Sequence, residues 1–304
     1  MNARQRGTAL LLVLWATILL AALIAGVAAS SRSQSQAALY GSERVRAELA
    51  AEAGLAHAVA GLRAPDLAHQ WVPDGRPYHF EFDGAQVTVR VVDVNGLVDL
   101  NAAPPRLLQA LFTAVGVNDT DASRLADTIV QWRSATPLPT NAPAAGGAAP
   151  GARGQASAAL NQARGPFRAI DQLARVPGVD LALYDRVAPS VTVFSGRNFP
   201  DVSFAGSAVL AALRGVTPQQ AKSLVDSRRR QPAQRGVTNG QAFGAVANGP
   251  LVAGYGGVVQ RVFSVAEMPD GTRVGLDATL RMALTGTMAR PYKVLAWRML
   301  APGF

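Results

Sequence analysis

The apolar segment at the N-terminus constrains this chain more than any other feature. Arg4 and Arg6 form a short basic lead, and residues 8–29 carry no charge and are rich in Leu, Ala, Val and Ile. At ~1.5 Å per residue, a helix of that length reaches ~33 Å, which is enough to cross the hydrocarbon core of a bilayer. Basic residues before such a segment stay cytoplasmic, so the sequence predicts one membrane pass with residues 30–304 on the far side.

Three interpretations of this segment are open. It can be a cleavable signal peptide, with small residues at Val27 and Ala29 before a cut at Ser30, although the apolar run is longer than the usual length of about 7 to 15 residues. It can also be a plain signal anchor. The third interpretation rests on Gly7, which lies between the basic lead and the apolar run and resembles the leader junction of type IV pilins and type II secretion pseudopilins. A prepilin peptidase cuts such leaders after the glycine, which would leave Thr8 as the new N-terminus.

The helical pattern continues beyond the apolar run. After a polar stretch at 30–36, apolar residues recur at steps of three, four or six as far as Leu62, and Pro65 ends the pattern. The sequence therefore predicts one helix from Thr8 to about Leu62, ~80 Å long. The alternative is a linker and a separate helix, with the interruption at Gly41 and Ser42.

Strand signals lie on both sides of a helical stretch. Residues 78–82 and 86–94 flank Asp83-Gly84 and predict a hairpin, and residues 258–267, 273–284 and 292–300 are three further strand candidates. Between them, 97–188 is helical in pattern, with Asn101 as a candidate helix cap before two prolines. Residues 191–194 return to strand character, and a further helix extends to residue 230.

The expected order of segments is a leader (1–7), a transmembrane and amphipathic helix (8–62), the first part of a β domain (63–96), an inserted α-helical domain (97–189) and the second part of the β domain (190–304). Within the insert, residues 137–165 are rich in Pro, Ala, Gly and Ser. Such a stretch buries too little apolar surface to offset the entropy of ordering, so a flexible loop is expected there. The fold class predicted is α+β.

The sequence contains no recognisable catalytic or metal-binding pattern. Cysteine is absent, which excludes disulfides, thiolate catalysis and Cys-ligated metals. His57, His69 and His79 share no metal-site spacing, and Asp93 and Asp99 are weak candidates for a hard cation. No phosphate loop, dinucleotide fingerprint or nucleophile elbow occurs. An enzymatic function is therefore not expected, and a periplasmic enzyme is the least favoured alternative.

Positive charge raises the question of a nucleic-acid partner. The net charge is +9, yet Lys222 and Lys293 are the only lysines, and Arg, Ala and Gly usage of this kind also results from a GC-rich genome. The arginines at 228–230 favour a solvated basic helix end over a phosphate contact.

The helices around Gly116, Gly178 and Gly215 resemble the helix-hairpin-helix modules of competence and repair proteins. Each hairpin lacks the second glycine of those modules. Acidic residues lie where a phosphate would approach, and their charge opposes binding; they are Asp119, Asp121 and Asp180. A membrane-anchored DNA-binding protein of the competence type is retained as the alternative function, and nucleic-acid binding is not expected.

Three motif segments and the Gly7 junction carry a family resemblance. The segments are Asn-Gly-Leu-Val-Asp-Leu-Asn-Ala-Ala-Pro at 95–104, Phe-Arg-Ala-Ile-Asp-Gln-Leu at 167–173 leading to Pro-Gly-Val at 177–179, and Val-Thr-Val-Phe-Ser-Gly at 191–196. With them, residues 4 to about 300 resemble the type II secretion minor pseudopilin K family, also called general secretion pathway protein K. The resemblance implies a pilin-like fold, in which a long N-terminal helix packs on an antiparallel sheet, with an inserted all-α domain.

The resemblance also implies a function and partners. The protein would be processed between Gly7 and Thr8, with Thr8 N-methylated, and would sit in the inner membrane with its globular domain in the periplasm. It would join minor pseudopilins I and J at the pseudopilus tip, where it would help to start and cap a filament that drives protein export. Major pseudopilins carry Glu at the fifth mature position, and Leu12 stands there in this chain. An apolar residue suits a tip subunit, because an unpaired carboxylate in lipid is costly. No cofactor is expected; calcium is doubtful, since the acidic loop of the family is replaced by 137–165.

Overall fold

The computed structural model describes residues 3–66, 69–134, 165–213, 215–230, 257–283 and 291–300, and on the first helix it describes side chains at 13–23 and from 41 onward. The loop expected at 137–165 lies outside the described residues except for Gly165, and the polar stretch at 231–256 lies wholly outside them.

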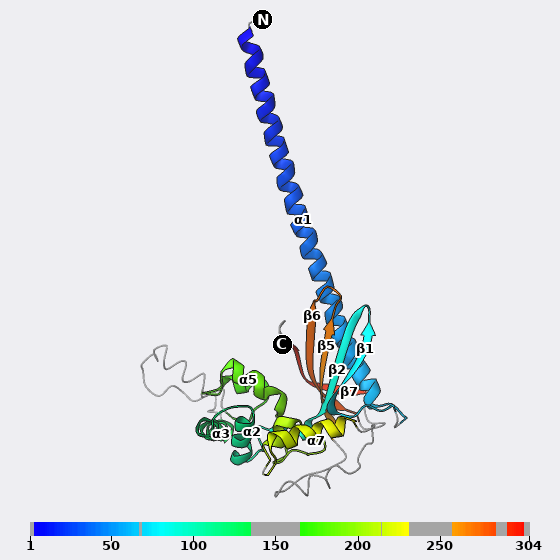
Figure 1. Cartoon of the computed structure of the whole chain (residues 1–304), viewed down its shortest axis with the longest axis vertical. Coiled ribbons are helices and arrows are strands. Elements are labelled where there is room, and N and C mark those ends of the chain that lie inside the picture. The colour runs from blue at the N-terminus through cyan, green and yellow to red at the C-terminus, as the bar shows by residue number, and fades with distance from the viewer. Residues whose placement is uncertain are drawn as a thin grey trace, which may run out of the picture.

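One long helix dominates the shape of the molecule. Helix α1 (Ala3–Leu62) runs for 60 residues and is not interrupted at Gly41 or Ser42, so the prediction of a continuous helix is confirmed, and the helix begins before Thr8. Its N-terminal part stands clear of the rest of the molecule (Figure 1). Within the described part of the chain, no helix meets the length and apolarity that a membrane crossing requires.

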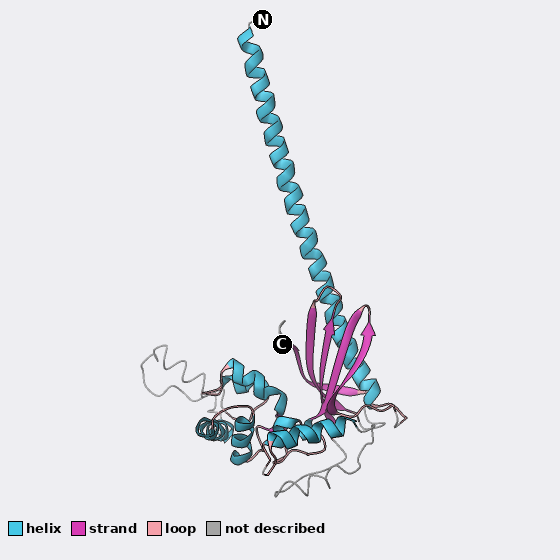
Figure 2. Ribbon diagram, viewed as in Figure 1, coloured by secondary structure: helices cyan, strands magenta, loops and turns pink. Residues whose placement is uncertain are grey.

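A five-stranded antiparallel sheet packs against the C-terminal part of α1 (Figure 2). Its strand order is β1-β2-β5-β6-β7, with bounds β1 (Asp74–Phe82), β2 (Ala85–Asp93), β5 (Val259–Glu267), β6 (Arg273–Met282) and β7 (Tyr292–Leu300). The two-residue turn between β1 and β2 has positive φ at Asp83 (48°) and Gly84 (78°), as a type I′ hairpin requires. The hairpin predicted at Asp83-Gly84 is therefore confirmed.

Alternate residues of the inner strands face α1 and form the first hydrophobic core. It contains Ala47, Ala51, Leu55, Ala58 and Leu62 of α1 with Val87, Val89, Val262, Leu276, Ala278 and Leu280 of the sheet. Gly54 marks the closest approach of helix to sheet, because a Cβ atom there would lie 2.0 Å from Ser264 Oγ. Small residues on this face of α1 thus let the helix lie directly on β2 and β5.

The chain between β2 and β5 builds a second, mainly helical part at the end of the sheet away from the N-terminus of α1 (Figure 1). Its elements, in order, are η1 (Val94–Gly96), β3 (Val98–Asp99), α2 (Pro105–Ala114), α3 (Asp119–Ser134), η2 (Ile170–Arg175), α5 (Leu181–Val187), η3 (Ala188–Ser190), β4 (Val191–Thr192), α6 (Ser207–Ala211) and α7 (Pro218–Arg230). One hydrophobic cluster, from Val98 to Val225, joins them. We call residues 94–230 the helical part.

The helical part extends further along the chain than the sequence predicted. Residues from 190 onward were expected to return to the β domain, but α6 and α7 pack into the helical cluster, and the large sheet resumes only at Val259. Strand β4 pairs in parallel with β3 in a separate two-stranded sheet. A short apolar run such as 191–194 predicts a strand but not the sheet that it joins, because its partner is chosen by tertiary packing. Residues 170–175, which lie in the stretch predicted to be helical, form a 3₁₀ helix.

Candidate functional site

The first of the three family-like motifs is joined to the third at Asp99, which is 1% exposed. Its Oδ1 accepts a hydrogen bond from Asn101 N at 2.8 Å. Its Oδ2 accepts from Ser195 N and Ser195 Oγ, both at 3.0 Å, and from Gly196 N at 2.7 Å. Hydrogen bonds to an ionised acceptor are the stronger kind, and here they tie β3 to the chain that leaves β4. We call Asp99, Asn101, Ser195 and Gly196 the Asp99 clamp.

The first motif is also joined to the second, through Asn101. The prediction that Asn101 caps the following helix is wrong, since the cap position of α2 is Pro104. The Asn101 amide instead pairs with the backbone of Phe167: Phe167 N donates to Oδ1 at 2.7 Å, and Nδ2 donates to Phe167 O at 2.9 Å. The amide thus satisfies a donor and an acceptor of a distant segment, which a cap would not require. Sequence reasoning missed this role because the two residues lie 66 positions apart.

A second buried carboxylate, Asp93, lies at the end of β2 and joins the chain that leaves the large sheet to the chain that returns to it at β5. It accepts hydrogen bonds from Asn95 N at 2.8 Å, from Gly257 N, and from Gln260 Nε2 at 3.0 Å. Burial raises the pKa of the Asp93 carboxyl, and these hydrogen bonds act in the opposite direction. Packing explains the glycine at position 96, because a Cβ atom there would lie 2.6 Å from the carbonyl carbon of Phe204.

An arginine of the sheet forms the next link to the helical part. Arg261 on β5 binds Asp277 on β6 through Nε at 2.9 Å and Nη2 at 2.7 Å, and its Nη1 donates to Ala188 O at 2.7 Å. Both charged side chains are buried. Arg298 on β7 also donates to Asp277 Oδ2 at 3.0 Å and reaches Tyr184 Oη of α5 at 2.7 Å. We call Arg261, Asp277, Arg298 and Tyr184 the Arg261 clamp.

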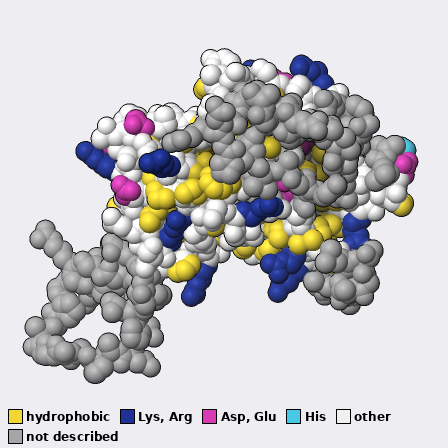
Figure 3. All heavy atoms as spheres, turned by 90° about the horizontal axis from the view of Figure 1, so that it is seen from below, with side chains coloured by type: hydrophobic (Ala, Val, Ile, Leu, Met, Phe, Trp, Pro, Cys, Tyr) yellow, Lys and Arg dark blue, Asp and Glu magenta, His cyan; other side chains and the backbone are white. Residues whose placement is uncertain are grey.

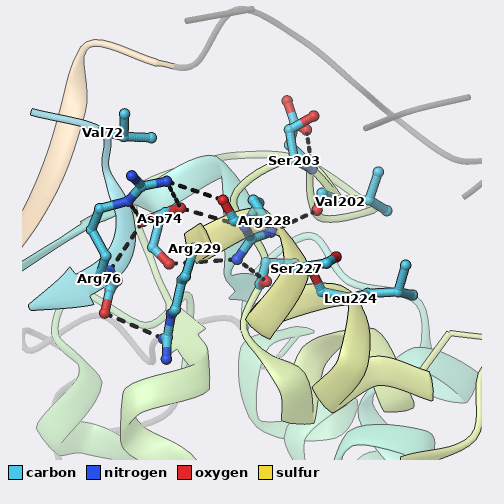
Figure 4. A network of polar contacts seen from close by, with 12 residues as sticks. Val72, Asp74, Arg76, Val202, Ser203, Leu224, Ser227, Arg228 and Arg229 are labelled. Atoms are coloured by element: carbon cyan, nitrogen blue, oxygen red, sulfur yellow. Dashed lines mark hydrogen bonds and ion pairs between the residues drawn. The ribbon is translucent and has the colours of Figure 1, made fainter. Parts of the chain in front are cut away.

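The third link joins α7 to the start of β1 (Figure 4). Arg228 donates to Val202 O at 3.1 Å, to Ala205 O at 2.9 Å and to Asp74 O at 3.4 Å, and Arg76 donates to both carboxylate oxygens of Asp74. The prediction of a solvated helix end is therefore wrong for Arg228, which is 6% exposed. Burial lowers the pKa of the Arg228 guanidinium to about 10, against the opposing charge of Asp74.

The Asp93, Arg261 and Arg228 contacts fix the helical part to the large sheet at three separate points, whereas the Asp99 clamp and the Asn101 contact join distant segments inside the helical part. Each links residues far apart in the sequence, and each uses a buried charge that is hydrogen-bonded on several sides, which specifies one relative arrangement of the two parts. The site is therefore a structural junction.

The remaining sequence candidates lie apart from this junction. The His57 ring on α1 lies 5.3 Å from Trp71 and 4.4 Å from Phe80, measured between ring centroids. His69 contacts Asp66 at 2.6 Å, and His79 contacts Thr88 at 3.0 Å. The described residues include no group of three or more His, Asp or Glu side chains that could hold a metal ion. The proposed processing and assembly positions Gly7, Thr8 and Leu12 lie in the first turns of α1, and their side chains are outside the described residues.

The hairpins of the DNA-binding alternative have other local roles. Gly116, Gly178 and Gly215 have positive φ, as helix-to-helix turns commonly require. Asp180 caps α5, because its Oδ1 accepts from Leu183 N at 2.7 Å. Seen from below, the described surface carries more basic than acidic side chains, with apolar side chains between them (Figure 3).

Comparisons with known proteins agree with this architecture. Residues 91–196 match the family model described as "Type II secretion system (T2SS), protein K". The structure is similar to a chain of "The Crystal Structure of the GspK-GspI-GspJ complex from enterotoxigenic Escherichia coli Type 2 Secretion System", with a TM-score of 0.52 and 16% sequence identity. That match covers 89% of this chain and 99% of the other. No curated protein sequence matches the chain.

The matched segment contains Asp93, the Asp99 clamp and the Asn101 contact, so the family pattern covers one link to the sheet and the contacts that join distant segments of the helical part. These observations define the class of protein: a component of the type II secretion system. Residues 91–196 are similar to protein K of that system, and this similarity supports the role of a minor pseudopilin. The resemblance drawn from the sequence is confirmed, and neither comparison supports the DNA-binding alternative.

Proposed function

We propose that this minor pseudopilin has a pilin-like fold with an inserted all-α domain, and that it occupies the tip of the pseudopilus. One observation carries the proposal: the helical part lies at the end of the sheet opposite the N-terminus of α1 (Figure 1). Subunits of a pilin-like filament stack along their N-terminal helices. A bulky part fixed across the far end would obstruct a subunit above it, so the chain would start and cap the filament that drives protein export.

The junction supports this role because a cap must keep its shape under load. Asp93, the Arg261 clamp and the contact of Arg228 with Asp74 oppose rotation of the helical part against the sheet, and the Asp99 clamp holds the helical part itself together. Non-covalent contacts at several separated points restrict this rotation more than the covalent chain connections alone would, because rotation would have to break all of these contacts.

We further propose that the apolar run at 8–29 anchors the protein in the inner membrane, with the globular parts in the periplasm. A prepilin peptidase would cut between Gly7 and Thr8, and Thr8 would be methylated. Leu12 takes the place of the Glu of major pseudopilins, which suits a subunit that needs no neighbour above it.

The proposed partners are minor pseudopilins I and J. The structurally similar chain belongs to a complex whose printed title names GspK, GspI and GspJ. The likeness extends over nearly all of both chains, which supports the same association for this protein.

The mass of the mature N-terminus tests the processing step. The chain would be expressed with and without a prepilin peptidase, beside a Gly7→Asp variant as the matched control. The expected result is a start at Thr8, with or without a methyl group, only for the wild-type chain with peptidase. A start at Ser30 or an uncut Met1 in that sample would overturn the proposed processing. Co-purification of the full chain with I and J then tests the association.

A further inference from the structure

Strand β7 forms one edge of the large sheet. It is the last strand in the order β1-β2-β5-β6-β7, and it contains no proline between residues 292 and 300. The strand at the other edge, β1, carries Pro77 and an irregular register next to it, and both features discourage the addition of a further strand. Of the two edges of this sheet, the β7 edge is therefore the one that offers its outer backbone N–H and C=O groups to an added strand.

Two cations lie opposite each other on β6 and β7. Arg281 of β6 pairs with Lys293 of β7, and both side chains are exposed. They lie on the face of the sheet away from α1, because the neighbouring Leu280 belongs to the core that packs on α1. Like charges directly opposite on adjacent strands destabilise a sheet. Neither cation forms an ion pair among the described residues, which include every Asp and Glu of the chain. A carboxylate that neutralises this pair would therefore come from another molecule.

A partly open pocket lies on the same face, beside the middle of β7. The pairing of β7 with β6 skips one residue, so Ala296 and Arg298 follow Lys293 on the face away from α1. Ala296 and Arg298 line the pocket from the sheet, and Ile170 and Phe194 line it from the helical part. The pocket is thus a space between the two parts of the molecule that opens next to the edge of the sheet.

The pocket suits an apolar side chain. Phe194 is half-buried and is a member of neither hydrophobic core, although it lies in the third family-like motif. Arg298 lines the pocket as well, but it already donates to Asp171 Oδ1 at 3.1 Å and to Asp277 Oδ2 at 3.0 Å. Because the charges around the pocket are paired with one another, the remaining apolar surface favours an uncharged, apolar group.

An added strand would present its side chains to these features at a suitable spacing. Adjacent strands lie about 4.8 Å apart, and residues two positions apart on one strand point to the same face, about 7 Å from each other. On the face away from α1, one such residue would lie beside Lys293 and the next beside Ala296 at the pocket. The residue between them would face Val294 and Trp297, which are 41% and 43% exposed.

We propose that the β7 edge, together with Arg281 and the pocket at Ala296, binds an extended segment of a partner protein in which an acidic and an apolar residue lie two positions apart. The acidic side chain lies between Arg281 and Lys293, and the apolar side chain enters the pocket beside Phe194. A second copy of β7 does not fit, because it would add cations and no carboxylate. The inference goes beyond the proposed function, since it assigns a peptide site that does not depend on a position in the filament.

The test measures the binding of short synthetic peptides to the full chain in detergent by fluorescence anisotropy. The probe alternates Thr and Val and carries Leu and Glu two positions apart. A matched peptide has Lys in place of the Glu, and two others are N-methylated at alternate positions, one for each edge of the strand. The probe should bind, whereas the Lys peptide and one of the two N-methylated peptides should not. Equal binding by both N-methylated peptides would overturn the proposal, because strand addition requires one edge of the peptide backbone.

Variants of the chain test the two side-chain contacts. Lys293→Glu should weaken binding of the probe about tenfold and allow the Lys peptide to bind. Lys222→Glu is the matched control, because Lys222 is exposed on α7 in the helical part, and it should bind as the wild type does. Ala296→Leu should fill the pocket and weaken the probe more than a peptide with Ala in place of Leu. If Ala296→Leu does not fold, Lys293→Glu still decides, since that side chain is exposed; unchanged binding by Lys293→Glu would refute the inference.

Cross-linking places the peptide on the chain. Because the chain contains no Cys, a Val294→Cys variant forms a disulfide only at that position. A probe with one Cys between Leu and Glu should cross-link to Val294→Cys and not to Leu181→Cys, a control position on α5 that is 72% exposed. Equal cross-linking at both positions, or cross-linking of two chains to each other in place of the probe, would overturn the proposal. Failure of the wild-type chain to bind I and J would refute the proposed function, whereas failure to bind the probe would refute only this inference.

Discussion

The Asp99 carboxylate allows the sharpest test of how the helical part is held together. In an Asp99→Ala variant, the backbone N–H groups of Asn101, Ser195 and Gly196 and the Ser195 hydroxyl all lose their acceptor. An orphaned buried donor costs about 1–3 kcal/mol, and these donors lie in a partly buried region, so the low end of that range applies to each. The expected loss in the free energy of unfolding is about 3–5 kcal/mol.

Urea unfolding of the full chain in detergent, followed by far-UV circular dichroism, measures this loss. With a denaturant slope of about 2 kcal/mol per molar urea, the midpoint should fall by about 1.5 M or more. Asp99→Asn keeps one acceptor oxygen but turns an NH₂ group towards other donors, so its loss should be intermediate. Asp185→Ala, on the exposed side of α5, is the control and should stay within about 0.5 kcal/mol of the wild type. A loss below about 1 kcal/mol for Asp99→Ala would refute the reasoning, because solvent would then be satisfying the donors.

Three further predictions follow from packing and charge. Gly54→Ala should cost about 1–3 kcal/mol in thermal or urea unfolding, because the new methyl group meets Ser264, whereas Gly41→Ala has open space around it and should gain about 0.5–1 kcal/mol; equal effects of the two changes would contradict the close contact. Burial first, and the hydrogen bond to a carboxylate next, raise the pKa of Tyr184 to about 12 from the ordinary 10.0, so the stability due to its retained proton is complete below about pH 10 and is lost as the pH rises through about 12. Absorbance titration at alkaline pH should show a late tyrosinate step that Tyr184→Phe removes, and an unchanged titration curve would argue against that environment. Arg261→Met should cost about 3–5 kcal/mol in urea unfolding because it leaves a buried carboxylate with fewer donors, and a neutral result would mean that the ion pair adds no stability.

Local signals in the sequence were enough to predict most of the regular elements. The continuous helix, the hairpin at Asp83-Gly84 and the three C-terminal strands each depend on periodicity or turn chemistry within a few residues. These elements form as predicted because their tertiary contacts favour the same local conformation that the sequence pattern does. The short family-like motifs were also visible, and they were enough to identify the family.

Pairings between distant segments were not predictable in the same way. The role of Asn101 depends on Phe167, and the burial of Arg228 depends on Asp74, more than 150 positions earlier. A single sequence shows the residue type at each position but not which distant group it meets, so a helix cap and a solvated arginine were reasonable but wrong interpretations. The length of the helical part was misjudged for the same reason, since packing decides which core α6 and α7 join.

The sequence by itself determined that a long, unbroken helix leads into an antiparallel β domain, because helix and turn formation are governed by neighbours along the chain. It also indicated the family, through three motifs whose residues meet inside the helical part. Only the tertiary structure decided that β4 joins β3, that buried charges fix the helical part across one end of the sheet, and that β7 extends uncovered beyond α1. Those features depend on which surfaces remain after packing, and packing is a property of the whole chain.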